Sequence, residues 1–351
     1  MSDLSWSLID ATLGQKSDLS VEQAQWAMNQ ILTGQAQAAE IKSFLVALKA
    51  KGESAQEVSA LVEQMYAFAA PIDIGERCVD TVGTGGDGAH TINISTTAAI
   101  ITTAAGARVI KHGNRAASSR SGAADLLQAL GVEINLNGAE VAESVRRIGL
   151  GFAFAPIFHP AMRFAGPARK ELGVATVFNI LGPLANPARP KAVAIGVADE
   201  RMLPIMAQVL ADRGCEGFLF RGHDGLDELS LSGPSTIIQI QDGQMHTEIF
   251  DPSNIGIERS QIEALVGGDA EFNANVTNRI FDGEQGAPRD AVLLNAAAAI
   301  AAFKGDFTLG IEQQLANGWV KATAAVDSGA AKNVLNSWRT LTHELFANRS
   351  Q

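Results

Sequence analysis

The chain is poor in cysteine, the residue that forms disulfides and many structural zinc sites in small folds. Its 351 residues include only two, Cys78 and Cys215. Two cysteines cannot build a disulfide framework, and no Cys/His cluster beside them completes a zinc site. We therefore interpret both as buried free thiols. The chain also has a single tyrosine, Tyr66, so aromatic stacking is not expected to be its general means of holding ligands.

The chain also has fewer basic than acidic residues. It contains 27 Lys and Arg and 38 Asp and Glu, which gives a net charge of −11. Such a surface repels nucleic acid and anionic lipid, so we expect neither as a partner, and an anionic ligand must meet a local positive site. Apolar runs such as 98–106 and 296–303 fall short of the roughly 20 residues that span a bilayer. The first ten residues lack the features of a secretion signal, so a cytoplasmic location is predicted.

What the sequence does contain begins with a helical section. Residues 1–70 are predicted to form four short helices that pack as a bundle, because their apolar residues recur at helical spacing. Two residue pairs have capping-box spacing, and three glycines stand where helices are expected to end. These positions are Ser20 with Gln23, Ser54 with Glu57, and Gly14, Gly34 and Gly52. A break at residues 71–75 closes the section.

From Cys78 onward, short β-rich runs alternate with Ala-rich helical stretches, which is typical of an α/β fold with a mostly parallel sheet and flanking helices. The predicted strands are 77–81, 108–111, 132–136, 151–155, 192–197 and 217–220, followed by a hairpin of 236–241 and 244–250 turned at Asp242-Gly243. Residues 160–190 form a second helical excursion. We predict a small helical domain of residues 1–72, joined by about 165–190, and a large α/β domain of 73–164 and 191–351.

The stretch from Asp80 to Ser121 concentrates glycines, hydroxyls and basic residues. The segment 83–87, GTGGD, follows a strand and precedes a helix opened by Asn93, Ser95 and Thr96. Glycines and a helix N-terminus together hold a phosphate through backbone N–H groups. Nearby cations and hydroxyls come from Lys111, Arg115, Arg120, Ser118 and Ser119. A plain tight turn explains the glycines alone but not the combination. The literal G-x-G-x-x-G match is not read as a dinucleotide site, because Lys111-His112 stands where an acid is expected.

An adjacent acidic pair, Asp227-Glu228, lies in a polar loop after a strand. Two neighbouring carboxylates offer the hard oxygen ligands that Mg²⁺ shares with diphosphate. Solvated loop acids are the alternative interpretation of this pair when it is taken alone.

Two motifs together resemble the anthranilate phosphoribosyltransferase family of tryptophan biosynthesis. They are D-x-x-G-T-G-G-D-x-x-x-T-x-N-I-S-T from Asp80 to Thr96 and K-H-G-N-R-x-x-S-S from Lys111 to Ser119. The resemblance continues through 159–162, Arg169, 171–173, 178–179, 181–184, 227–228 and 289–295, and so spans nearly the whole chain. It implies a homodimer with the fold type of pyrimidine nucleoside phosphorylases and a site in the cleft between the two domains.

The resemblance also implies roles by matched position. Phosphoribosyl pyrophosphate would be bound by Gly83, Gly86, Asp87, Thr91, Asn93, Ile94, Ser95, Thr96, Lys111, His112, Gly113, Asn114, Arg115, Ala116, Ala117, Ser118, Ser119 and Ala123. Anthranilate would be bound by Gly83, Asn114, His159, Arg169 and Pro183. Mg²⁺, two ions per subunit, would be held by Ser95, Asp227 and Glu228. No residue is assigned as a general acid or base.

The implied reaction moves 5-phosphoribose from phosphoribosyl pyrophosphate to the amine of anthranilate and releases pyrophosphate. Two alternatives remain open at this point. One is a pyrimidine nucleoside phosphorylase of the same fold, although that group carries K-x-S-G-R-G-L where this chain has K-H-G-N at 111–114. The other is a non-catalytic phosphoribose-binding protein.

Overall fold

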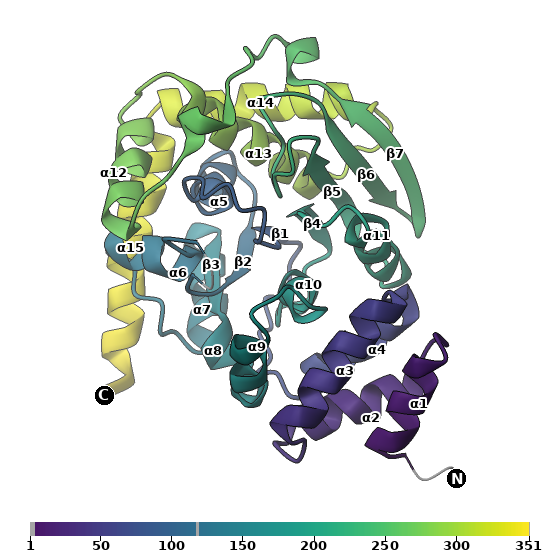
Figure 1. The fold of residues 1–351 in the computed structure, drawn as a ribbon. Helices are drawn as coiled ribbons and strands as arrows, with labels where there is room; N and C mark the ends of the chain where they lie inside the picture. Colours follow the sequence, from purple (N-terminus) through teal and green to yellow (C-terminus); the bar gives the residue numbers. More distant parts are fainter. Residues whose placement is uncertain (1–3, 117–118, 351) are drawn as a thin grey trace.

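The structure is a computed structural model that describes residues 4–116 and 119–350 (Figure 1). The N-terminal section forms the four predicted helices, α1 Trp6–Gly14, α2 Val21–Leu32, α3 Ala38–Lys51 and α4 Ala55–Ala67. Both predicted capping boxes are present: the N–H of Gln23 donates to Ser20 Oγ, and the N–H of Glu57 to Ser54 Oγ. These caps satisfy N–H groups that the first turn of a helix leaves open, which is why the two helices begin there.

The described residues form one seven-stranded sheet with the strand order β3-β2-β1-β4-β5-β6-β7. The first five strands in that order are parallel and the last two antiparallel, so the predicted mostly parallel α/β sheet is confirmed. The predicted hairpin is β6–β7. The strands are β1 Val79–Gly83, β2 Val109–Gly113, β3 Leu150–Phe154, β4 Ala192–Gly196, β5 Glu216–Gly222, β6 Ser235–Gln241 and β7 Gln244–Phe250.

Alternate side chains of the central strands enter two separate cores. On β4, Ala192 and Ala194 pack with the helices drawn above and to the left of the sheet in Figure 1. Val193 and Ile195 instead pack with α11 and the N-terminal bundle. The remaining helices of eight or more residues are α5 Ile94–Ala104, α7 Gly138–Ile148, α11 Met202–Asp212, α12 Ala270–Phe281, α13 Ala287–Lys304, α14 Ile311–Asp327 and α15 Ala330–Ala347. Shorter helices are α6 Ala123–Ala129, α8 Ala155–Phe158, α9 Gly166–Leu172 and α10 Phe178–Leu184, with 3-10 turns η1 Pro160–Phe164, η2 Pro252–Ile255, η3 Ile262–Leu265 and η4 Asn348–Ser350.

The predicted strand at 132–136 is wrong. The segment forms neither strand nor helix, and Val132, Ile134 and Leu136 are buried, which accounts for the alternating pattern in the sequence. No neighbouring strand pairs with it among the described residues. Instead the N–H of Glu133 donates to Thr342 Oγ1 on α15 at 3.2 Å, so the alternation records packing against helices and not a sheet position.

The helical excursion after Pro160 contacts the N-terminal bundle. Ala168 and Leu181 lie in the same hydrophobic core as the bundle helices. Tyr66 Oη donates to the carbonyl of Leu184 at 3.0 Å, and Lys42 of α3 pairs with Glu171 of α9 at 2.5 Å. Segments far apart in the chain therefore form one helical layer beside the sheet. Among residues 4–116 and 119–350, every helix is too short or too polar to cross a membrane.

Candidate active site

The sheet reverses its strand order between β1 and β4, and both strands end in glycine at their carboxyl ends. Ligands of α/β sheets bind at such a reversal point. The loop after β5 crosses this edge so closely that side chains are excluded there. A Cβ at Gly83 would lie 2.1 Å from Asp227 Oδ2, and one at Gly196 would lie 1.7 Å from the Asp227 carbonyl oxygen. Because neither glycine has a side chain, Asp227 packs directly against the carboxyl ends of β1 and β4.

The predicted glycine loop leaves β1 at this point and faces the same carboxylate. The N–H of Gly85 donates to Asp227 Oδ2 at 2.6 Å, and Gly85 and Gly86 both have positive φ. Asp87 Oδ1 accepts from the N–H of Ala89 at 3.1 Å, and the Asp87 carboxyl lies close enough to Asp227 to raise the pKa of that residue. The loop then enters α5, whose first turn carries Ile94, Ser95 and Thr96. We call residues 83–96 the cradle.

Three residues predicted for the site meet at the start of α5. Lys111 Nζ, which is buried, donates to Ser95 Oγ at 3.2 Å and to the carbonyl of Thr81 at 2.6 Å. The backbone N–H of Ser95 lies near the Glu228 carboxylate and favours its charged form. The structure therefore brings Ser95, Lys111 and Glu228 together, although Glu228 lies far from the other two in the chain.

The charges of this cluster are not balanced. Asp87, Asp227 and Glu228 lie near each other, with Lys111 as the nearest cation. Burial, and then the neighbouring Asp87, raise the pKa of Asp227 to about 7. Burial and the adjacent Asp227 raise the pKa of Glu228 well above its usual range, against the attraction of Lys111. Burial lowers the pKa of Lys111, and Asp80 is the largest opposing influence.

These residues fit a magnesium ion. A divalent cation would offset the surplus carboxylate charge, and the oxygens of Ser95, Asp227 and Glu228 are the hard ligands that Mg²⁺ takes. Within residues 4–116 and 119–350 no group of three His, Cys, Asp or Glu side chains is arranged as a complete metal site. The remaining ligands would therefore come from substrate oxygens and water, as is usual for Mg²⁺ bound with phosphates.

The second predicted motif forms β2 and the loop that follows it. Arg115 makes an ion pair with Asp125 of α6 at 2.7 Å and stacks over Phe154, so its charge is already partnered within the protein. Asp125 also accepts from the N–H groups of Ala116 and Gly122, both at 3.0 Å, and so holds the two ends of the loop together. Other predicted residues here are Gly113 at the end of β2, Asn114, whose Oδ1 accepts from the N–H of Arg115, and Ala123 at the start of α6.

The far end of this loop joins the cradle through one carbonyl group. The carbonyl oxygen of Ser121 accepts from Ser119 Oγ at 3.2 Å and from Asn93 Nδ2 at 3.0 Å. Thr91 forms an isolated antiparallel bridge with Val266. Ala117 and Ser118, also predicted for the site, lie outside the described residues.

A pair of histidines lines the side of the site that faces α10. His112 Nδ1 lies 3.0 Å from the carbonyl of Gly182, and His159 Nε2 lies 2.7 Å from the carbonyl of Ala185. Each of these nitrogens must carry a proton in order to donate, and the two rings are 5.2 Å apart. The predicted Pro183 lies inside α10, between the two carbonyl groups. The Nε2 atom of His112 is buried without a protein partner in the described part of the chain.

Arg169 stands apart from these clusters. Its guanidinium lies over the ring of Phe178 at 5.3 Å, and burial lowers its pKa. It forms no ion pair with any residue of 4–116 or 119–350, whereas exposed arginines nearby, such as Arg189, do have acidic neighbours. A partly buried guanidinium without a carboxylate partner is suited to an anionic ligand.

Two residues of the site escaped the sequence analysis. Asp80 is buried, accepts from the N–H of His112 at 3.3 Å, and accepts from Asn186 Nδ2 at 2.8 Å. Burial raises the pKa of Asp80 to about 6. Asp80 was visible as the first residue of the glycine motif, but nothing local marks Asn186, which reaches it from 106 positions along the chain.

The neutral state of His112 predicts a pH dependence of stability. Burial, and then the neighbouring His159, lower the pKa of His112 to about 3, while Lys111 and Asp80 are the other ionisable groups beside it. Between pH 6.5 and about 3 the unfolded chain binds a proton there that the folded protein does not. The free energy of unfolding should therefore fall as the pH falls, by about 1.4 kcal/mol per pH unit from this group.

Urea unfolding at pH 7, 6 and 5 measures this slope. The His112→Gln variant, which keeps a donor for Gly182, should show a flatter dependence on pH than the unsubstituted chain. Parallel slopes in the two proteins would contradict the assignment of His112 as a buried neutral imidazole.

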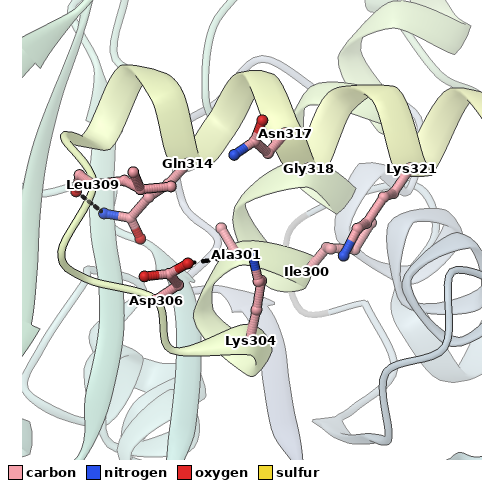
Figure 2. A pocket seen from close by; sticks show the side chains of 9 residues that line it. All are labelled: Ile300, Ala301, Lys304, Asp306, Leu309, Gln314, Asn317, Gly318 and Lys321. Atoms are coloured by element: carbon pink, nitrogen blue, oxygen red, sulfur yellow. Dashed lines mark hydrogen bonds and ion pairs between the residues drawn. The ribbon is translucent and has the colours of Figure 1, made fainter.

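A small hollow lies between the carboxyl end of α13 and α14 (Figure 2). Figure 2 shows the Gln314 amide bonded to the carbonyl of Leu309 and Lys304 paired with Asp306 at its mouth. Its volume of about 20 Å³ is close to that of one water molecule, and it shares no residue with the cluster around Asp227. We do not assign it to the candidate site.

The chain is a glycosyl transferase, as two family models that together cover most of it show. The model described as "Glycosyl transferase family, a/b domain" matches residues 75–332, and the one described as "Glycosyl transferase family, helical bundle domain" matches residues 8–69. More narrowly, the chain belongs to the anthranilate phosphoribosyltransferase family. It is 51% identical over 344 residues to the anthranilate phosphoribosyltransferase of Rhodococcus jostii, covering 98% of this chain and 95% of that protein.

Solved structures agree in fold. The anthranilate phosphoribosyltransferase of Thermus thermophilus superposes with a TM-score of 0.87 at 38% identity, over 95% of this chain and 99% of that one. The Saccharomyces cerevisiae enzyme in complex with phosphoribosyl pyrophosphate and Mg gives a TM-score of 0.88 at 28% identity, over 98% and 99%. The yeast enzyme has also been solved with 4-fluoroanthranilate, at a TM-score of 0.85 and 26% identity over 97% and 99%. The predicted fold class and family are confirmed.

Proposed function

We propose that this chain transfers the 5-phosphoribosyl group of phosphoribosyl pyrophosphate to the amine of anthranilate and releases pyrophosphate. The observation that carries the proposal is the acidic cluster of Asp227 and Glu228 with Ser95 and Lys111, seated on the glycine ends of β1 and β4. This cluster provides oxygen ligands for a cation beside a helix N-terminus that favours phosphate. Membership in the family supplies the substrate pair.

The cradle and the loop after β2 are the proposed binding site of phosphoribosyl pyrophosphate. The backbone of 83–88 and the first turn of α5 would face the diphosphate, and residues 111–119 with Ala123 would border the ribose phosphate. Arg115 contributes through its backbone and its ordering of the loop, since its guanidinium is paired with Asp125. The other residues predicted to bind phosphoribosyl pyrophosphate keep their predicted roles.

Mg²⁺ is the proposed cofactor, two ions per subunit, with Ser95, Asp227 and Glu228 as the protein ligands. When bound, the metal offsets the negative charge of the diphosphate and of the pyrophosphate as it leaves. Lys111 holds Ser95 in place through its hydrogen bond to Ser95 Oγ and is itself fixed by the Thr81 carbonyl.

The acceptor side is proposed to lie between the histidine pair and Arg169, with Gly83, Asn114 and Pro183 at its border. The anthranilate carboxylate would pair with the Arg169 guanidinium, and Gly182 and Pro183 of α10, which carry no large side chain, would leave room for the ring. The amine nitrogen then bonds to C1′ of the ribose while the bond from C1′ to pyrophosphate oxygen breaks, its electron pair leaving with pyrophosphate. The new ammonium loses one proton to water or a nearby acceptor. Orientation of the two substrates and charge stabilisation supply the rate enhancement.

Incubating the protein with phosphoribosyl pyrophosphate, Mg²⁺ and anthranilate, and following the loss of anthranilate fluorescence, tests the proposal. We expect turnover that depends on all three additions. Phosphorolysis of thymidine or uridine would indicate the nucleoside phosphorylase alternative instead. Binding of phosphoribosyl pyrophosphate without turnover of any aromatic amine would indicate a non-catalytic protein.

The family resemblance also supports a homodimer and a division into two domains, residues 1–72 with about 165–190 and residues 73–164 with 191–351. The cleft between the two domains would then close around the substrates by movement of one domain against the other. Sedimentation equilibrium measures whether the protein is a homodimer. Small-angle scattering with and without both substrates measures whether the domains close.

A further inference from the structure

Asn93 stands at the N-cap of α5, yet its side chain makes no hydrogen bond to the helix. Asparagine is among the preferred N-cap residues because its side-chain oxygen accepts from an N–H of the first turn. Here the oxygen is engaged elsewhere: Asn273 Nδ2 of α12 donates to Asn93 Oδ1 at 2.8 Å. The amide group of Asn93 donates to the carbonyl of Ser121 at 3.0 Å. The side chain is therefore turned away from the helix that it begins.

The orientation of both amides follows from the backbone groups at the two ends of this chain of hydrogen bonds. The N–H of Gly268 can only donate, and it donates to Asn273 Oδ1 at 2.9 Å. Asn273 Nδ2 must then face Asn93, whose Oδ1 accepts. Asn93 Nδ2 faces the carbonyl of Ser121, which can only accept. Flipping either amide would place donor against donor or acceptor against acceptor, so the arrangement is unique.

Asn273 is built to hold this position. It is 2% exposed, and the loop before α12 is paired with the cradle along its backbone. The N–H of Gly267 donates to the carbonyl of His90 at 2.8 Å, and the N–H of Ile92 donates to the carbonyl of Leu265 at 2.9 Å. A residue with fixed backbone neighbours and one buried rotamer orients its partner with little loss of conformational entropy.

We propose that Asn273 is a positioning residue for phosphoribosyl pyrophosphate: it diverts Asn93 from capping α5, so that the N–H of Thr96 in the first turn remains available to the substrate's diphosphate. The N–H of Ile94 already donates to the carbonyl of Ile92 at 2.8 Å, and the N–H of Ser95 faces Glu228. The inference rests on the proposed function, because that function places the diphosphate at this helix. It assigns no contact between Asn273 and the substrate. The same hydrogen bonds tie the cradle to the loop that carries Ser119, since Ser121 is their common acceptor.

Two variants separate this role from simple packing. Asn273→Ala removes both hydrogen bonds of the side chain. Asn273→Asp keeps the volume and the acceptor for Gly268 but replaces the donor that faces Asn93, so Asn93 must turn and is released toward the helix. Both variants are expected to raise the KM and Kd for phosphoribosyl pyrophosphate by about 10-fold, with kcat and the KM for anthranilate within about 3-fold of the unsubstituted protein.

The matched control is Thr277→Val, one turn further along α12. Thr277 Oγ1 hydrogen-bonds to Thr97 Oγ1 at 3.0 Å, so this variant loosens the same pair of helices without touching Asn93. Its melting temperature should fall as in Asn273→Ala, while its Kd for phosphoribosyl pyrophosphate stays unchanged. An unchanged Kd in Asn273→Ala, or an equal rise in Thr277→Val, would overturn the inference.

Isothermal titration with phosphoribosyl pyrophosphate and Mg²⁺ gives these Kd values without any turnover. The proposed function fails if the unsubstituted chain binds the ligand but does not consume anthranilate. In that case the Kd values for phosphoribosyl pyrophosphate of Asn273→Ala, Asn273→Asp and Thr277→Val still decide whether Asn273 is a positioning residue. If Asn273→Asp does not fold because of its buried charge, Asn273→Ala alone decides between the outcomes.

Discussion

Replacing Asp227 by Asn together with Glu228 by Gln is expected to lower kcat/KM by about 10³-fold, the equivalent of about 4 kcal/mol of transition-state stabilisation. Both side chains keep their shape, and an amide oxygen remains to accept from the N–H of Gly85. What is lost is the negative charge that holds the cation against the diphosphate. Steady-state kinetics at rising Mg²⁺ concentrations measures the change, and the Mg²⁺ needed for half-maximal activity should rise as well.

The same double variant should be more stable than the unsubstituted chain in metal-free buffer. Two buried, adjacent carboxylates repel each other and lose hydration on folding, and neutral amides remove both penalties. We expect the free energy of unfolding to rise by about 1–3 kcal/mol. A loss of activity joined to a gain in stability distinguishes a ligand-binding pair from a pair that supports the fold.

Asp224→Asn is the control for this pair. Asp224 belongs to the same loop, but its carboxylate lies beside the end of β5 and accepts from Ser230 Oγ and Ser232 Oγ, both at 2.5 Å. Its kcat/KM should stay within about 3-fold of the original. Full activity of the double variant without added metal would contradict the magnesium assignment.

The parts of the fold that the sequence predicts well are those with local causes. Ser20 and Ser54 cap their helices through residues three positions away, and the turn at Asp242-Gly243 joins two adjacent strands. The segment 132–136 fails because alternation reports which side chains are buried and not what buries them. Pairing with a strand and packing against α15 produce the same alternating pattern.

The candidate site divides in the same way. The cradle and the acidic pair are contiguous in sequence, so glycine content and charge reveal them. The partners that orient them are distant: Asn273 lies 180 positions from Asn93, and Asn186 lies 106 positions from Asp80. Arg115 shows the same limit, since a basic residue in a phosphate motif suggests a ligand contact, and nothing in the local sequence reveals its ion pair with Asp125. Composition gives the charge of a side chain but not its partner.

Arg169→Lys should raise the KM for anthranilate by about 10²-fold and leave the KM for phosphoribosyl pyrophosphate within about 3-fold. The substitution keeps a positive charge but removes the planar fork that pairs with both oxygens of a carboxylate, a difference of about 3 kcal/mol when the pair is shielded from water. The burial that lowers the pKa of Arg169, and the missing acidic partner in the described part of the chain, make the guanidinium available for a ligand.

The matched control is Arg163→Lys. Arg163 stacks on Phe164 at 4.7 Å as Arg169 stacks on Phe178 at 5.3 Å, but Arg163 is exposed, so its loss removes a similar cation–aromatic contact without an enclosed charge. We expect both KM values to stay unchanged in that variant. Equal losses toward both substrates in Arg169→Lys would mean that the arginine supports the packing of α9 on α10. A loss confined to anthranilate requires the guanidinium to meet the acceptor, because the cradle that would hold phosphoribosyl pyrophosphate lies between β1 and α5 and, among the described residues, forms no hydrogen bond or ion pair with Arg169.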